Sequence, residues 1–478
     1  MSETMKYIST RGGDECHSFS DVVLEGQARN GGLFVPQQIP NVEDKLSEWR
    51  SLKFHDLALE VIRLYADDIP IDDLRQIVNT AYNTFDHPDV TPVHALKNYD
   101  ILELWHGPTL AFKDVALQFL ANVFEYVLKK KNKVLNILGA TSGDTGSAAI
   151  HGIKGKDRMR IFIMHPEGKT SAMQRLQMVT VTEPNVFNIA INGSFDDCQL
   201  IMKNTFDTLE FKDKYHLGTI NSINFARILA QITYYFSAYF QVTKDNAEVV
   251  NFSVPTGNFG DIFAGFLAKR MGLPVGKLVV ATNENDILTR FFRDGVYQKS
   301  DVAFTISPSM DIQVASNFER YMYYRMNGDG PAVAKMINDF KTKGVVTVEK
   351  QNGIVDPDFL AGRGGTDEVM ATIKKYDTEE HYILDPHTAV GVYVAEQLAP
   401  VLPGRTVCLA TAHPAKFPDS IQEALGHIAT HPSLEAIKGN AEHYEKLAND
   451  QQKVMEFMSS AIDRSEANGE CADKCHIL

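Results

Sequence analysis

The sequence predicts an α/β protein whose strands form parallel sheets. Short apolar runs alternate with segments in which apolar residues recur at three- and four-residue intervals, the spacing of helices. Glycine-rich loops stand where an apolar run gives way to such a helix, as they do in parallel sheets. The strands expected on this basis are 134–138, 160–164, 249–254, 277–281 and 406–411.

The length of the chain, 478 residues, predicts more than one folding unit. Residues 1–92 hold a short strand pattern at 7–11 and two helical patterns, so a small helical domain is expected there. From 93 to 420 strands and helices alternate, which indicates the α/β body. Residues 421–478 are expected to form a helical extension.

The charge balance restricts the class of partner. There are 47 Lys and Arg against 61 Asp and Glu, which gives a net charge of −14. Such an acidic chain argues against a nucleic-acid surface and against binding to anionic membranes. Any phosphate site must therefore be local, built from backbone N–H groups and one or two cations.

The cysteines and the ends of the chain indicate the cellular compartment in which the protein is expected. The cysteines are scattered, without metal-binding spacing, at Cys16, Cys198, Cys408, Cys471 and Cys475. Free thiols in a reducing cytoplasm are the simplest interpretation. The first residues resemble no targeting peptide, and no apolar run approaches the roughly 18 residues of a membrane span. The final residues, from Cys475, fit a prenylation box only loosely, and a frayed tail fits them better.

A lysine in the segment 106–116, His-Gly-Pro-Thr-Leu-Ala-Phe-Lys-Asp-Val-Ala, is the leading candidate for a reactive group. Lys113 lies between a Gly-Pro turn and a long amphipathic helix, for which Asp114 is the expected N-cap. Desolvation there would lower the pKa of the amine, and a neutral amine attacks an aldehyde. By placement alone, a surface lysine ahead of a helix fits better.

Two glycine-rich loops are candidates for anion binding. Thr-Gly-Asn-Phe-Gly-Asp at 256–261 joins a strand to a helix, where tight turns and unpaired N–H groups suit a phosphate. Thr-Ser-Gly-Asp-Thr-Gly at 141–146 brings hydroxyls and N–H groups to a similar turn, which suits a carboxylate or a phosphate. Each loop by itself also fits a purely structural turn.

Further polar residues are ambiguous when taken singly. Thr411 ends a strand and is either a ligand or a buried hydroxyl bonded to backbone. Ser222, Asn224 and Arg227 could bind an anion, cap a helix or form a surface ion pair. The histidines show no i, i+4 pairing, so no metal site is expected, and the stretch from His387 is typical of a capped helix start.

Together these segments resemble threonine synthases, members of the tryptophan-synthase-β-like, fold type II pyridoxal-phosphate (PLP) enzymes. The resemblance covers most of the chain, in order and at similar spacing. It includes 7–12 and 31–36, which are similar to the N-terminal domain of the family. It implies that 93–420 is a PLP-dependent catalytic region of two α/β subdomains.

The resemblance also implies roles for individual residues. Lys113 matches the lysine that binds PLP covalently and later acts as the base at the substrate Cα. Thr411 matches the residue opposite the pyridine nitrogen. The residues matching the cofactor-phosphate loop are Gly257, Asn258, Phe259 and Gly260, followed by Asp261, which is expected to contact the phosphate indirectly or to cap N–H groups. The residues matching substrate-binding positions are Thr141, Ser142, Asp144 and Thr145 for the carboxylate and Ser222, Asn224 and Arg227 for the phosphate.

The implied activity is that of a lyase that converts O-phospho-L-homoserine and water to L-threonine and phosphate. Alternatives are a phospho-lyase that releases 2-oxobutyrate from the same substrate, a serine/threonine dehydratase, and a catalytically inactive binding protein. Two phosphate groups, one on the cofactor and one on the substrate, match two separate anion loops. A monomer or a homodimer is expected.

Overall fold

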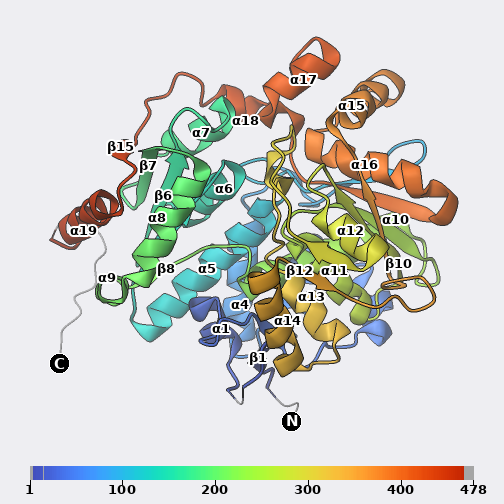
Figure 1. Ribbon diagram of the computed structural model, residues 1–478, viewed down its shortest axis with the longest axis horizontal. Coiled ribbons are helices and arrows are strands. Elements are labelled where there is room, and N and C mark those ends of the chain that lie inside the picture. Colours follow the sequence, from blue (N-terminus) through green and yellow to red (C-terminus); the bar gives the residue numbers. More distant parts are fainter. Residues whose placement is uncertain (1–3, 14, 468–478) are drawn as a thin grey trace. The chain divides into compact units, whose positions relative to one another are not determined.

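The computed structural model describes residues 4–13 and 15–467, and its chain divides into two compact units (Figure 1). The first unit comprises Met1–Ala116 and Ser222–Thr430, and the second comprises Leu117–Asn221 and His431–Leu478. The division falls within the long helix α5 (Lys113–Lys131).

The described part of the first unit contains a six-stranded sheet in the order β13-β10-β9-β14-β4-β3. Its strands are β3 (Val93–Ala95), β4 (Asp100–Glu103), β9 (Val250–Pro255), β10 (Val275–Thr282), β13 (Phe359–Arg363) and β14 (Arg405–Ala410). Neighbouring strands are parallel, except that β3 and β4 are antiparallel. All residues of β9 are buried, as expected of a strand covered on both faces. The prediction of a parallel α/β architecture is confirmed.

Helices surround this sheet. Those described in the first unit are α1 (Phe19–Glu25), α2 (Leu46–Trp49), α3 (Phe54–Ile62), α4 (Ile71–Tyr82), α10 (Phe225–Val242), α11 (Gly260–Arg270), α12 (Ile287–Asp294), α13 (Phe318–Arg325), α14 (Gly330–Lys343), α15 (Thr366–Glu380), α16 (Pro386–Leu398) and α17 (Pro418–Leu425). Short 3-10 turns are η1 (Glu43–Lys45), η2 (Pro308–Met310), η3 (Ala399–Val401) and η4 (Pro414–Lys416).

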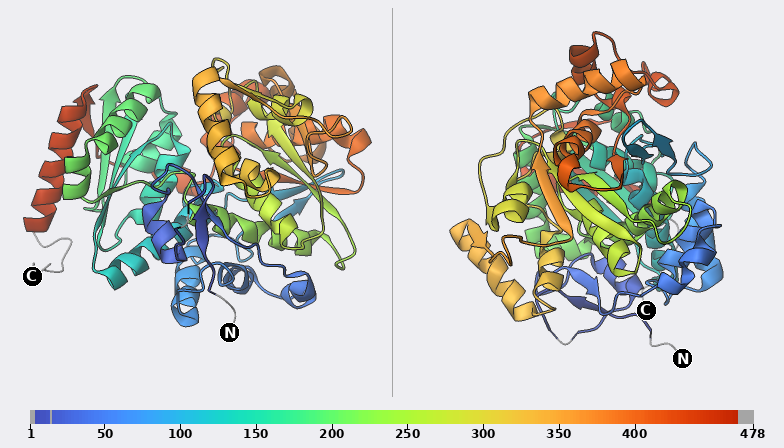
Figure 2. Two further views of the ribbon diagram at one scale, coloured as in Figure 1. Left: turned by 60° about the horizontal axis from the view of Figure 1, so that its bottom comes forward. Right: turned by 90° about the vertical axis from the view of Figure 1, so that its right-hand side faces the viewer.

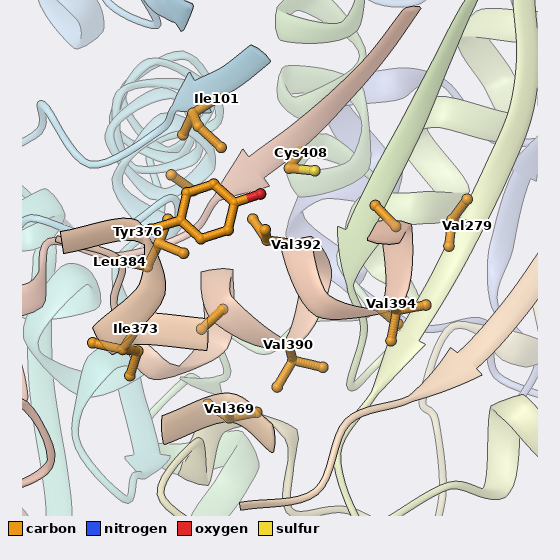
Figure 3. Packing of buried hydrophobic residues seen from close by; sticks show 14 of the residues in the cluster. Ile101, Val279, Val369, Ile373, Tyr376, Leu384, Val390, Val392, Val394 and Cys408 are labelled. Carbon is orange, nitrogen blue, oxygen red and sulfur yellow. The ribbon is translucent and has the colours of Figure 1, made fainter. Parts of the chain in front are cut away.

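An apolar core lies between the sheet and the helix pair α15 and α16 (Figure 3). Val392 of α16 and Tyr376 of α15 point toward Cys408 of β14, and Val279 of β10 extends the cluster. These residues are at most 4% exposed, so the carboxyl end of β14 rests on a close-packed base. That rigidity matters because Thr411 follows β14 directly.

The N-terminal region is mainly helical, as predicted, and adds a small antiparallel pair. The strand expected at 7–11 is β1 (Tyr7–Ser9), which pairs with β2 (Phe34–Pro36). Arg11 forms a bidentate ion pair with Glu319 of α13, at 2.8 and 2.9 Å. A second antiparallel pair joins β11 (Val296–Gln298) to β12 (Val345–Thr347).

The described residues of the second unit form a five-stranded parallel sheet in the order β15-β7-β6-β5-β8. Its strands are β5 (Leu135–Ala140), β6 (Met159–Pro166), β7 (Val186–Asn192), β8 (Leu217–Gly218) and β15 (Glu445–Ala448). Its remaining helices are α6 (Asp144–Ile153), α7 (Ala172–Val179), α8 (Phe195–Asp207), α9 (Leu209–Lys214), α18 (Pro432–Glu435) and α19 (Gln451–Ala467). Helix α8 contacts β5 and β6, and α19 lies beside α8 (Figure 2).

The prediction of a purely helical tail is wrong at Glu445–Ala448. This segment is strand β15, which pairs in parallel with β7 from Ile189 to Asn192. This four-residue segment, which includes the polar Glu445 and Lys446, shows no strand periodicity. Its extended conformation is therefore stabilised by pairing with the edge of β7. The expected C-terminal features at Cys471 and Cys475 lie outside the described residues.

Within residues 4–13 and 15–467, no helix combines the length and the apolar character that a bilayer crossing requires. The described cysteines Cys16, Cys198 and Cys408 are free thiols.

Candidate active site

Lys113 is the first residue of α5 and follows a tight turn that begins at Gly107. The main-chain N–H and the hydroxyl of Thr109 both donate to the carboxylate of Asp114, each at 2.8 Å. A Cβ at Gly107 would lie 2.4 Å from the Cβ of Asp114, so the close approach requires glycine. The prediction of Asp114 as the N-cap is wrong, because it lies inside the helix and closes the turn instead.

The electrostatics of this turn follow from burial. Asp114 is fully buried, and desolvation raises the pKa of its carboxyl to about 6 against the opposing hydrogen bonds from Thr109. Lys416 is also fully buried, and its Nζ donates to the carbonyl of Thr109 at 2.5 Å. The turn is thus held by a buried acid on one side and a buried amine on the other.

The lysine turn is bonded to the segment that follows β14. The N–H of Phe112 donates to the carbonyl of Thr411 at 2.8 Å, and that of His413 donates to the carbonyl of Leu110 at 3.1 Å. These bonds form a short antiparallel bridge. They bring Lys113 and Thr411, which lie far apart in the sequence, onto neighbouring segments of the first unit.

The amine of Lys113 is buried, with the residue 8% exposed, and its Nζ donates to Ser309 Oγ at 3.2 Å. A Cβ at Gly257 would lie 2.9 Å from the carbonyl oxygen of Ser309, so the glycine-rich loop closely approaches the same residue. Thr411 is 6% exposed, and its N–H donates to Thr388 Oγ1 at 3.3 Å. The lysine, the strand end and the glycine loop are therefore structurally linked.

The loop 256–261 lies between β9 and α11, and its conformation is strained at Phe259. This residue has a φ of 62°, in the left-handed region that bulky side chains avoid. Its buried ring stacks on Phe292, with centroids 5.9 Å apart, and meets the rings of Phe318 and Tyr321. No side chain caps the N-terminus of α11 within the described structure, so the N–H groups of its first turn suit an anion.

Asp261 is turned toward α10. Its Oδ1 accepts hydrogen bonds from the hydroxyls of Tyr234, at 2.5 Å, and Tyr235, at 2.9 Å, so it does not cap neighbouring N–H groups. Desolvation raises the pKa of this buried carboxyl to about 6, although both hydroxyls favour the ionised form. A protonated Asp261 places less negative charge beside the loop than an ionised one would.

The block 222–227 lies at the start of α10. Asn224 caps this helix by accepting from the N–H of Ala226 at 3.1 Å. Arg227 is 5% exposed, and among the described residues its Nε and Nη1 have no hydrogen-bond partner. Desolvation lowers the pKa of its guanidinium to about 10. A buried cation with unsatisfied donors is the expected state of an anion-binding residue.

Two serines join this block to the glycine-rich loop. Ser222 Oγ and Ser316 Oγ lie 2.8 Å apart, and Ser316 Oγ donates to Asn258 Oδ1 at 3.2 Å. Asn317 Nδ2 donates to the carbonyls of Ser222 and Asn258, at 3.1 and 3.2 Å. The two segments expected to bind phosphates are thus bridged by Ser316 and Asn317.

Arg320, on α13, fixes this connection. It is fully buried and donates to Asn317 Oδ1 at 2.5 Å, to the carbonyl of Ile223 at 2.6 Å and to that of Phe34 at 2.9 Å. Desolvation lowers the pKa of its guanidinium to about 9. Sequence reasoning missed Ser309, Asn317 and Arg320, because an irregular segment and an amphipathic helix carry no motif for them.

The second unit holds the other predicted loop, between β5 and α6. The hydroxyl of Thr141 accepts from the N–H groups of Gly143, at 3.0 Å, and Gly146, at 2.9 Å. Asp144 is 5% exposed and accepts from Gln174 Nε2 at 2.8 Å. Ser142 is exposed and Thr145 is half-buried. Thr141 and Asp144 therefore take part in hydrogen bonds within the second unit, whereas Ser142 is accessible to solvent.

The residues of the first unit fit PLP. They combine a buried amine at Lys113, a strained glycine loop at a helix N-terminus and a buried hydroxyl at Thr411. An aldehyde-reactive amine and a phosphate cradle are the groups that such a cofactor requires.

Comparison with known proteins also indicates a PLP-binding protein. The family described as pyridoxal-phosphate dependent enzyme matches residues 86–336, so the chain is a PLP-dependent enzyme. The families described as threonine synthase N terminus and threonine synthase, C-terminal, match residues 6–82 and 388–458. The chain belongs to the threonine synthase family.

Individual relatives span nearly the whole chain. A threonine synthase of Schizosaccharomyces pombe is 47% identical over 89% of this chain and 90% of its own length. A threonine synthase of Pseudomonas aeruginosa is 44% identical over 97% of this chain and all of its own. The crystal structure of PLP-bound threonine synthase from Brucella melitensis has a TM-score of 0.93 at 43% identity, and covers 96% of this chain and 99% of its own.

Proposed function

We propose that this enzyme converts O-phospho-L-homoserine and water to L-threonine and phosphate. The observation that carries the proposal is that Ser316 and Asn317 bridge the two candidate anion-binding segments in the unit that holds the buried amine of Lys113. A substrate that carries its own phosphate needs a second anion site beside that of the cofactor. A dehydratase acting on serine or threonine does not.

Residues of the first unit would hold the cofactor. Lys113 would bind it covalently, the N–H groups of 257–260 would bind its phosphate, and Thr411 would face its pyridine nitrogen. When bound, PLP supplies the electron sink that stabilises negative charge at the substrate Cα. A neutral hydroxyl at Thr411 suits that site because it does not require a protonated ring nitrogen.

Side chains of the protein would transfer protons and bind the substrate. Lys113 would act as the base that takes the proton from the substrate Cα and would return protons later. Arg227, on α10, and Ser222, which precedes that helix, would bind the substrate phosphate, with Asn224 capping the helix. Thr141, Ser142, Asp144 and Thr145 of the second unit are proposed to bind the substrate carboxylate. Removal of a proton from Cβ and of phosphate from Cγ, return of a proton to Cγ, and addition of water across Cβ (hydroxyl) and Cα (proton) would complete the reaction.

Product analysis tests the proposal. The PLP-loaded protein is incubated with O-phospho-L-homoserine, and threonine, 2-oxobutyrate and phosphate are measured. Threonine and phosphate in equal amounts support the proposal. Release of 2-oxobutyrate would identify the phospho-lyase, and no turnover despite a cofactor band would identify a binding protein; either result contradicts the proposal.

We also propose a cytoplasmic monomer or homodimer. The free thiols at Cys198 and Cys408, both buried, suit a reducing compartment. Sedimentation of the purified full-length chain gives its mass directly, and a species larger than a dimer would contradict the proposed state.

A further inference from the structure

We propose that Ser309 is a further catalytic residue, whose hydroxyl holds the amine of Lys113 in its reactive position. The inference rests on the proposed role of Lys113. Ser309 lies in the 3-10 turn η2 of the long segment between β11 and α13, with Oγ 3.2 Å from Lys113 Nζ. A serine hydroxyl can accept from a protonated amine and donate to a neutral one, so it stays bonded to Lys113 in both states.

His387 sets the position of Ser309. The N–H of Ser309 donates to His387 Nε2 at 3.2 Å. Because Nε2 is an acceptor, the proton of the neutral ring is on Nδ1, which lies 2.9 Å from Asp385 Oδ1. His387 is 3% exposed, and its ring packs against that of Phe417, with centroids 4.9 Å apart. The ring therefore has a fixed orientation.

Asp385 is the shared anchor of this arrangement. As the N-cap of α16, it accepts from the N–H groups of His387, at 2.9 Å, and Thr388, at 3.2 Å. It also accepts from the hydroxyl of Thr388, which in turn accepts from the N–H of Thr411. One buried carboxylate thus positions Ser309, through His387, and Thr411, through Thr388.

The glycine-rich loop adds a third constraint. Gly257 approaches the carbonyl oxygen of Ser309 so closely that an added Cβ would lie 2.9 Å from it. Ser309 is therefore held from the side of the loop, from His387 and from Lys113. His387 and Gly257 constrain the backbone of Ser309, and this fixes the place of its hydroxyl beside Lys113, as positioning a reactive amine requires. His387 and Asp385 are accordingly positioning residues.

A shape-matched pair of variants tests the role of the hydroxyl. Ser309→Thr keeps it, whereas Ser309→Val replaces it with a methyl group of the same shape. Ser300→Ala, at an exposed position of the same segment, is the control. The measurements are the rate at which the visible band forms when PLP is added, the fraction fixed on Lys113 by borohydride, and kcat and KM.

We expect Ser309→Val to form the fixable adduct more slowly, and to lose about 10- to 100-fold in kcat with KM within about threefold of the wild type. Ser309→Thr and Ser300→Ala should stay within about threefold in every measurement. An unchanged kcat and band-formation rate in Ser309→Val, or equal losses in the Thr and Val variants, would overturn the role of the hydroxyl. Absence of a fixable adduct in the wild type would instead overturn the proposed function.

His387 is tested separately. His387→Gln keeps an acceptor for the N–H of Ser309, whereas His387→Leu does not. We expect the Leu variant to reproduce the slow band formation of Ser309→Val and the Gln variant to recover at least part of the rate. Equal rates in both variants and the wild type would overturn the positioning role.

Discussion

Thr109 donates both its main-chain N–H and its hydroxyl to the carboxylate of Asp114, each over 2.8 Å. These two hydrogen bonds close the turn that precedes Lys113 at the start of α5. Because both residues are fully buried, water cannot replace either donor. The position of the Lys113 amine therefore depends on the contact between Thr109 and Asp114, in which Lys113 itself takes no part.

Thr109→Val tests that dependence. The change preserves shape but removes the hydroxyl, and leaves one oxygen of Asp114 without that donor. We expect the free energy of unfolding to fall by about 1–3 kcal/mol. Denaturant unfolding measures it, with Thr342→Val, at an exposed helical position, as the control. Equal stability of both variants would refute the importance of the contact.

The raised pKa of the Asp261 carboxyl should make the free energy of unfolding depend on pH. The fold raises its pKa from 3.8 to about 6, so the folded state binds a proton more tightly than the unfolded chain does. This contribution is fully present below about pH 4 and is lost as the pH rises through 6, with roughly 3 kcal/mol as its upper limit. Asp261→Asn cannot titrate.

The measurement is the difference in unfolding free energy between the wild type and Asp261→Asn from pH 4 to 7. We expect the wild type to lose stability relative to the variant over this range. Asp114, with a pKa also raised to about 6, is common to both proteins and cancels. A difference independent of pH would contradict the assignment.

Two glycines of the cofactor loop should differ in their tolerance of alanine. A Cβ at Gly257 meets the Ser309 carbonyl at 2.9 Å, whereas one at Gly260 meets its nearest neighbour, the Asn317 side chain, at 3.3 Å. We expect Gly257→Ala to weaken PLP binding about tenfold or more, and Gly260→Ala to weaken it less. Titration of the visible band with PLP measures both, and the reverse order would refute the arrangement.

Arg320 should support both cofactor affinity and stability. Arg320→Met leaves the carbonyls of Phe34 and Ile223 without their charged donor in a buried site. We expect a loss of about 2–4 kcal/mol in unfolding free energy and weaker PLP binding. Arg293→Met, at an arginine whose side chain is 64% exposed, is the control. Unchanged PLP affinity in Arg320→Met would contradict its role in joining the two anion segments.

Much of the fold could be predicted because its signals are local. Buried strands such as β9 are continuous apolar runs, and the capped start of α16 is visible in Asp385-Pro-His387. The site residues of the first unit occur in short loops whose residue types follow from anion chemistry. The resemblance to threonine synthases indicated Lys113 as the reactive lysine, whereas its placement alone favoured a surface lysine. That latter expectation is wrong, because the residue is buried.

What could not be predicted depends on tertiary contacts. Ser309 becomes important only because a distant histidine and a distant lysine meet it, and no spacing encodes that meeting. In the sequence Arg320 is an ordinary helical arginine. Its role follows only from the fold, in which three carbonyl groups accept its hydrogen bonds. Strand β15 exists because β7 has an open edge, which a four-residue polar segment does not signal.

Borohydride reduction of the PLP-loaded protein, followed by peptide mapping, tests the central claim most directly. We predict a single pyridoxyl adduct on the peptide containing Lys113, with loss of the visible band, and no adduct there in Lys113→Ala. An adduct on another lysine, or a yellow and active Lys113→Ala protein, would contradict the account.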